Sequence, residues 1–201
     1  MTEQTSRAAN PWSTDLYDRL WVAGRGRLRF GLPKVESVPK RARALSAEGM
    51  RRLRTEWLGL RIDLYDYAGV PRGQRAVAIR RLCTLDDLAT VICAAFGRED
   101  TEHLYSYEIG GRRFSHPALA AGDGAATTDV AIGELGLRSR QEFFHVYDMG
   151  DYWQHGCKVE SIPRDVVAAL ASHGADRAAA PALQYAARGR APRQYPRSDW
   201  D

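Results

Sequence analysis

The residues of this sequence with the greatest chemical potential lie near residue 105 and between residues 143 and 160. Three of the five histidines, His103, His145 and His155, occur there together with Asp148 and Asp151. A histidine that is oriented by a carboxylate can act as a general acid or base near neutral pH. The same donors could hold a divalent metal ion that activates water for hydrolysis of a phosphoester or an amide. We therefore take Asp148, Asp151, His155 and His103 as candidate catalytic residues, and Asp148, Asp151 and His155 as a candidate site for a divalent metal.

Aromatic and polar side chains accompany these histidines at every second position. Because alternate residues of a strand lie on the same face of a sheet, strands from both regions could bring these side chains to one surface. We expect that surface to lie opposite the aliphatic side of the sheet. The candidate pocket residues are Tyr105, Tyr107, His145, Tyr147, Trp153 and Glu160. A pocket of this kind would suit a small-molecule ligand.

A purely structural interpretation fits the same residues. Asp148, Gly150 and Asp151 stand between two predicted strands, where a turn needs aspartates that accept backbone hydrogen bonds and a glycine that adopts positive φ. Tryptophan and tyrosine pack on sheet faces, and a buried histidine usually finds a hydrogen-bond partner. Packing, binding without chemistry and catalysis therefore stay open as three interpretations.

Hydrophobic periodicity predicts the elements that would position these residues. Leucine and isoleucine alternate with other residues over 58–64, which predicts a strand, and a turn rich in glycine and proline leads to a second strand over 76–82. Thr84 and Asp87 form a capping-box pattern before an apolar stripe that ends at Phe96. Gly97 suits the left-handed conformation that ends many helices. A hairpin followed by a helix is expected.

The rest of the chain predicts more strands and two flanking segments. Strands are expected within 102–114, 141–148 and 151–162, a long connection with one helical turn near 130–135 lies between them, and a short helix follows Pro163. We predict an α+β fold in which an antiparallel sheet packs against one main helix. The predicted organisation is a basic N-terminal extension over 1–54, a single α+β domain over 55–173 and an extended Pro/Arg-rich C-terminal tail over 174–201.

Composition favours a globular cytoplasmic protein. Hydrophobic residues make up 44% of the chain and charged residues 27%, which are average values that disfavour disorder and a membrane-embedded body. No apolar run approaches the roughly 18 residues of a spanning helix, and the N-terminus has no secretory pattern, so no membrane partner is expected. Cys83, Cys93 and Cys157 are widely spaced, which predicts reduced thiols. The motifs GxxxxGK[ST], GxGxxG and HExxH are absent from the sequence.

Positive charge is concentrated in the N-terminal extension. Residues 1–54 contain 12 Lys and Arg against 5 Asp and Glu, a net charge of +7, whereas residues 55–201 contain 17 against 20, a net charge of −3. Basic segments neutralise phosphates, which predicts contact with nucleic acid. The candidate nucleic-acid-binding residues are Arg25, Arg27, Arg29, Arg41, Arg43, Arg51, Arg52 and Arg54. Because 26 of the 29 basic residues are arginine, an arginine-biased, solvated segment is the alternative.

Two blocks of residues together resemble a known family. One block contains Phe143, His145, Tyr147-Asp148-Met149-Gly150-Asp151, Trp153, His155 and Val159-Glu160, and the other contains Ala94-Ala95-Phe96-Gly97, Glu102 to Tyr107 and Gly110 to Phe114. The first is similar to the aromatic-x-aromatic-x-Tyr-Asp-Phe-Gly-Asp-x-Trp-x-His-x-x-x-Glu signature of the plasmid pRiA4b ORF-3-like family. The resemblance covers about 58–162. Arg98 departs from it, since the family usually has tryptophan there.

The resemblance implies an α+β fold of the alpha-beta roll kind and a link to insertion sequences, but no established activity. We therefore expect a mobile-element-associated accessory protein that contacts nucleic acid through its basic flanks. The predicted antiparallel sheet does not provide the doubly wound domain of a serine resolvase, which favours binding over strand cleavage. One alternative is a small-molecule enzyme or metal-assisted hydrolase that uses the aromatic, histidine and aspartate pocket. Another is a protein-interaction adaptor, or homo-oligomer, anchored by Trp12, Trp21 and Phe30.

Overall fold

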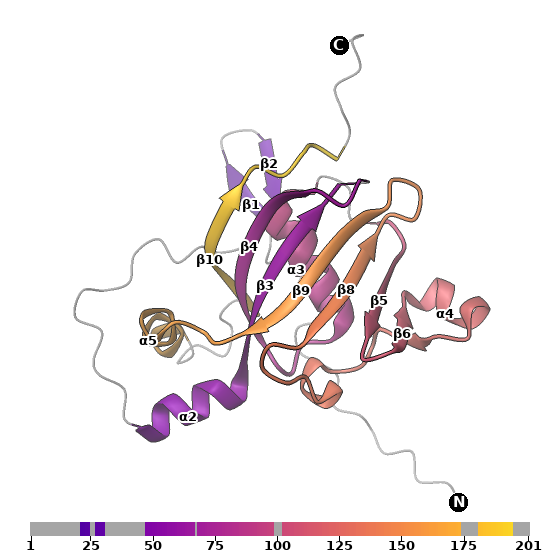
Figure 1. The fold of residues 1–201 in the computed structure, drawn as a ribbon. Coiled ribbons are helices and arrows are strands. Elements are labelled where there is room, and N and C mark those ends of the chain that lie inside the picture. The colour runs from indigo at the N-terminus through magenta and orange to yellow at the C-terminus, as the bar shows by residue number, and fades with distance from the viewer. Residues whose placement is uncertain are drawn as a thin grey trace, which may run out of the picture.

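The computed structural model describes residues 21–24, 27–30, 47–66, 68–98, 102–173 and 181–194, and an eight-stranded sheet dominates it (Figure 1). In sheet order the strands are β10 (Ala182–Gly189), β4 (Pro71–Arg80), β3 (Trp57–Tyr65), β9 (Trp153–Glu160), β8 (Glu142–Tyr147), β5 (Tyr105–Ile109), β6 (Arg112–Ser115) and β7 (Ala126–Thr127). Neighbouring strands are antiparallel except β6 and β7, which are parallel. The predicted α+β class is confirmed.

The hairpin of β3 and β4 supplies the aliphatic face of the sheet. Leu58, Leu60, Ile62 and Leu64 alternate along β3 and are all buried, as their period of two predicts. Leu60 lies opposite Val77 of β4 in the register, so the two strands present one continuous apolar surface. Burying this surface is the main favourable term for the sheet.

Helix α3 (Leu85–Phe96) packs on that surface and is seen behind the sheet in Figure 1. The predicted capping box is present: the Thr84 hydroxyl accepts from the Asp87 N–H, and the Asp87 carboxylate accepts from the Thr84 N–H. At the other end Gly97 adopts a φ of 65° and its N–H donates to the Ala94 carbonyl. The sequence therefore specifies both ends of this helix through local hydrogen bonds.

The opposite face of the sheet is covered at the end where β3 begins and β9 ends. Helices α2 (Ala47–Glu56) and α5 (Arg164–His173) lie at that end in Figure 1, and a second apolar cluster forms there. It contains Trp57, Ala78, Val166, Leu170 and Leu183, with Leu53 packed against it. Elsewhere on this face the described residues are mainly polar, and they leave strands β5, β8 and β9 open to solvent on that side.

Three segments differ from or extend the sequence-based expectations. The connection over 115–140 contains the expected turn, the 3-10 helix η1 (Ile132–Leu135), and also α4 (Pro117–Asp123), which was not predicted. The segment predicted as a tail over 174–201 contributes the strand β10, so the sheet extends beyond residue 173. Within 1–54, a small hairpin joins β1 (Trp21–Gly24) to β2 (Arg27–Phe30).

The described residues also bear on two earlier predictions, one on the cysteines and one on membrane-spanning helices. The three cysteines are buried and form no disulfide. Within the ranges given above, the helices are too short or too polar to span a membrane.

We expect Gly59→Ala to destabilise the fold by about 2 kcal/mol, because a Cβ there would lie 2.5 Å from the Glu160 carbonyl oxygen of the neighbouring strand and 2.8 Å from Ile162 Cγ1. Backbone atoms at this position cannot move without disturbing the ladder of β3 and β9. Urea denaturation measures the change. Gly122→Ala in α4 is the matched control, since a Cβ there meets nothing within 4 Å. Equal stability of the two variants would contradict the expectation.

Candidate functional site

The predicted rings do converge, but inside the core. Across β9 and β3 the register pairs His155 with Leu64 and Cys157 with Ile62, so the histidine and the aliphatic residues share one face. Tyr105, Tyr107 and Tyr147 belong to the same buried cluster, beneath α3. The expectation that the ring surface lies opposite the aliphatic side is therefore wrong. Alternation fixes which residues of one strand share a face, whereas the register between strands decides which face that is.

His145 and His155 form a buried pair. Their Nδ1 atoms are 3.3 Å apart and their rings are 0% and 1% exposed. Burial lowers the pKa of His145 from 6.5 to about 3. Burial, and then the nearby charges of His145 and Arg98, hold the pKa of His155 well below its ordinary value. Both rings are therefore neutral at pH 7, and catalysis by His155 lacks the water-accessible cavity that it requires.

The remaining predicted catalytic residues lie in and beside the turn between β8 and β9. Asp148 adopts a φ of 58°, and its Oδ1 accepts from the N–H groups of Gly150 and Asp151 at 3.0 and 3.2 Å. Its Oδ2 lies 3.6 Å from Nδ1 of His103. These two hydrogen bonds to the backbone are those that the structural interpretation of the turn predicts for an aspartate. Asp148 therefore contacts His103, whereas the ring of His155 contacts His145.

The candidate metal site is not assembled. Among the described residues there is no group of three histidine, cysteine, aspartate or glutamate side chains placed to hold a metal ion. Asp148 is committed to its turn and His103, Asp151 is exposed, and His155 is enclosed in the core. The structure therefore does not bring the three predicted ligands together.

Glu160 lies outside the ring cluster. Its Oε1 accepts from Nη1 of Arg61 at 3.0 Å on the other face of the sheet. It follows Val159, whose side chain is buried on the ring side, so Glu160 is one residue out of phase with the predicted pocket. The structure therefore does not bring Glu160 together with the other predicted pocket residues.

The tyrosines of β5 connect the sheet to the beginning of α3. The Tyr107 hydroxyl donates to the Leu85 carbonyl at 2.9 Å, and the Tyr105 hydroxyl donates to the Asp86 carboxylate and lies 3.4 Å from Thr128 Oγ1. Burial raises the pKa of both hydroxyls. Neutral, hydrogen-bonded and enclosed, they serve packing in the described structure.

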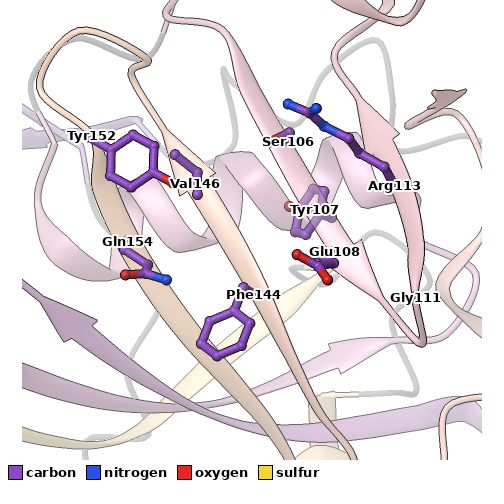
Figure 2. A pocket seen from close by; sticks show the side chains of 9 residues that line it. All are labelled: Ser106, Tyr107, Glu108, Gly111, Arg113, Phe144, Val146, Tyr152 and Gln154. Carbon is purple, nitrogen blue, oxygen red and sulfur yellow. The ribbon is translucent and has the colours of Figure 1, made fainter. Parts of the chain in front are cut away.

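A groove of about 550 Å³ lies on the opposite, open face of the sheet. It is lined by Ser106, Tyr107, Glu108, Gly111, Arg113, Phe144, Val146, Tyr152 and Gln154. Figure 2 shows Phe144, Val146, Tyr152 and Gln154 along one side, from β8, β9 and their turn, and Glu108 and Arg113 from β5 and β6 along the other. Of these residues, sequence reasoning singled out Tyr107 alone.

Two exposed aromatic rings distinguish this groove. Phe144 is 46% exposed and Tyr152 is 48% exposed, although both are large apolar side chains. Glu108 offers a carboxylate, Gln154 an amide that can donate and accept, and Arg113 a guanidinium that lies 3.6 Å from the Asp123 carboxylate. The arrangement supplies flat surfaces for stacking next to groups that can read the hydrogen-bonding edge of a ligand.

The predicted nucleic-acid-binding arginines are only partly within the described residues. Arg25, Arg41 and Arg43 lie outside them. Arg27 and Arg29 belong to β2, and Arg51, Arg52 and Arg54 belong to α2. Arg51 and Arg52 are exposed, and Arg52 makes an ion pair of 2.8 Å with Glu56. Among the predicted adaptor anchors, Trp21 lies opposite Phe30 in the β1 and β2 hairpin, and Trp12 lies outside the described residues.

Comparison with known proteins adds a family and a fold. The sequence profile described as plasmid pRiA4b ORF-3-like protein matches residues 57–182, a span that contains both the ring cluster and the groove. No curated protein matches the chain. The fold is similar to the crystal structure of a protein of unknown function from Methanosarcina mazei Go1, with a TM-score of 0.52 and 20% identity over 69% of this chain and 72% of that chain.

Proposed function

This chain belongs to the plasmid pRiA4b ORF-3-like family, and from that premise we propose that it is an accessory protein of mobile genetic elements that binds single-stranded nucleic acid. The observation that carries the proposal is the open groove with its two exposed rings, Phe144 and Tyr152. The plasmid in the family's description and the positive N-terminal extension support it.

The groove chemistry suits unpaired bases. Every base has a flat face, so stacking on an aromatic side chain tolerates many sequences and contributes about 1–3 kcal/mol per base. Carboxylate, amide and guanidinium groups such as those of Glu108, Gln154 and Arg113 can then meet base edges. Bases within a duplex are stacked on each other and are not available to a sheet face. Single-stranded nucleic acid is therefore the favoured ligand.

The phosphates would be attracted by a different part of the chain. Glu108 and Arg113 are directly opposite in the register of β5 and β6, and Arg113 also lies near Asp123, so the groove itself has little excess positive charge. Residues 1–54, with a net charge of +7, provide it. We assign stacking to the groove and phosphate neutralisation to the basic extension.

We expect Phe144→Ala and Tyr152→Ala each to weaken binding of a fluorescein-labelled deoxythymidine oligonucleotide by about 5- to 100-fold, the equivalent of one lost stacking contact. Fluorescence anisotropy measures the affinity. Because both side chains are about half exposed, the fold is expected to persist, which circular dichroism checks.

Leu82→Ala is the matched control for these variants. Leu82 is 47% exposed, similar to the two rings, and it lies after β4, outside the groove. Its affinity for the oligonucleotide is expected to equal that of the wild type. Wild-type affinity in both ring variants would remove the groove from the proposal.

A further inference from the structure

The guanidinium of Arg98 is buried on the ring side of the sheet, away from the groove. The residue is 1% exposed, and its Cζ lies 3.9 Å from the centroid of the Trp153 ring. Its Nη1 donates to the Pro192 carbonyl at 3.3 Å. These contacts satisfy one edge of the group. They are made at the C-terminal end of α3, where the helix dipole also favours a positive charge.

The other edge of the guanidinium is unsatisfied. Among the described residues neither Nε nor Nη2 of Arg98 has a hydrogen-bond partner, and both atoms are buried. These two nitrogens carry parallel N–H groups, the pair that binds two oxygens of one carboxylate or phosphate. A buried charge without such a partner is strongly unfavourable. Of the carboxylates in the described part of the chain, Asp151 is the one whose charge acts on Arg98, and it forms no hydrogen bond or ion pair with the guanidinium.

Within the described part of the chain, further unpartnered polar atoms belong to Trp153, whose ring packs against Arg98, to His155, whose pKa the charge of Arg98 lowers, and to His145, which contacts His155. Nε1 of Trp153, Nε2 of His155 and Nε2 of His145 are buried without a hydrogen-bond partner. The two histidines share one proton between their Nδ1 atoms when neutral. The ring that accepts this proton must carry its own proton on Nε2, so one of the two Nε2 atoms is a donor. Arg98, Trp153 and the pair therefore present donors without acceptors.

We propose that Arg98, Trp153 and the His145 and His155 pair form an internal site for a small oxyanion that offers two oxygens, such as phosphate or a carboxylate. The Nε and Nη2 edge of Arg98 would bind both oxygens, and the neighbouring ring N–H groups would complete the set of donors. Residues 191–194 cover the site, since Ala191 packs against the core and Gln194 is 4% exposed. The anion enters when this segment moves aside. This site is independent of the groove.

Thermal unfolding in sodium phosphate and in sodium chloride of equal ionic strength tests the proposal. A ligand that binds only the folded state raises Tm, and phosphate at ten times its Kd is expected to raise Tm by about 3 °C relative to chloride. Arg98→Met, which keeps the side-chain length and removes the charge, should show no such difference. Arg98→Lys keeps a charge without the two parallel N–H groups and should show less than half of it. Arg138→Met, at an exposed position, should respond as the wild type does.

Equilibrium dialysis with radiolabelled phosphate gives a second readout that does not depend on stability. At the same phosphate concentration about one phosphate per chain should bind to the wild type, none to Arg98→Met and less than half a phosphate to Arg98→Lys, so one folded variant is sufficient. The carboxylate of the chain itself that acts on Arg98 is tested by Asp151→Asn. If wild-type protein binds no phosphate at millimolar concentration, or only the Asp151→Asn variant does, the proposed site for a free anion is overturned.

Discussion

Acidification from pH 7 to pH 4.5 is expected to lower the free energy of unfolding by about 3 kcal/mol through His145 alone. In the folded protein burial holds the pKa of this ring at about 3, whereas the unfolded chain has the ordinary value of 6.5. Between these two values the unfolded state binds a proton that the folded state does not, so stability falls as the pH falls. The loss begins near pH 6.5 and continues down to about pH 3. Urea denaturation at several pH values measures it.

Two variants separate the histidine from other acid-sensitive groups. His145→Phe should show a smaller loss between pH 7 and pH 4.5, because it removes one of the two rings that must stay neutral. Tyr107→Phe is the matched control: it removes the hydrogen bond to the Leu85 carbonyl in the same cluster, so it should lower stability at every pH by a similar amount. A wild-type protein whose stability is the same at pH 7 and pH 4.5 would contradict the buried, neutral pair.

Raising NaCl from 50 to 200 mM is expected to weaken oligonucleotide binding about 300-fold. The estimate takes about six phosphate contacts from the 12 basic residues of 1–54 and a slope near −0.7 per contact for single strands. Changing five arginines of this extension to glutamine leaves seven of its 12 basic residues and should reduce the slope from about −4 to about −2.5. These are Arg25, Arg27, Arg29, Arg41 and Arg43. Fluorescence anisotropy over a series of salt concentrations gives the slope for each protein.

A second five-arginine variant is the control for net charge. It changes exposed arginines outside residues 1–54 to glutamine, namely Arg138, Arg140, Arg164, Arg190 and Arg193. Because the two variants lose the same charge, a general effect of net charge would alter both slopes equally. We expect a clearly smaller slope for the N-terminal variant alone, and equal slopes of the two variants would oppose the assignment of phosphate binding to residues 1–54.

The elements that the sequence predicts best are those specified by local hydrogen bonds. The limits of α3 follow from Thr84, Asp87 and Gly97, each of which acts within a few residues of its own position. Strand β3 follows from its alternation. Strand β10 was not predicted, because its pairing with β4 joins residues about a hundred positions apart and three of its eight residues are alanine, which has a low preference for strands. Helix α4 has only 7 residues, too few for a periodic pattern.

For the candidate site as well, the sequence predicts relations within one strand but not the pairing between strands. That His145, Tyr147 and His155 share one face follows from the period of two within their strands. That this face is the aliphatic one follows only from the register of β9 on β3, which no local signal reports. The groove was missed for the complementary reason. Phe143 and Phe144 are adjacent on one strand and therefore lie on opposite faces of the sheet, but the sequence alone does not say which of them faces the open side.

Photo-crosslinking to an oligonucleotide that contains 4-thiothymidine, followed by mass spectrometry of the crosslinked peptides, locates the residues that the bases contact. We expect crosslinks at Phe144 and Tyr152, on the open face of the sheet, in addition to those in residues 1–54. The first two crosslinks should disappear in the Phe144→Ala and Tyr152→Ala variants, respectively. Crosslinks confined to residues 1–54 would contradict the assignment of the groove as the surface on which the bases stack.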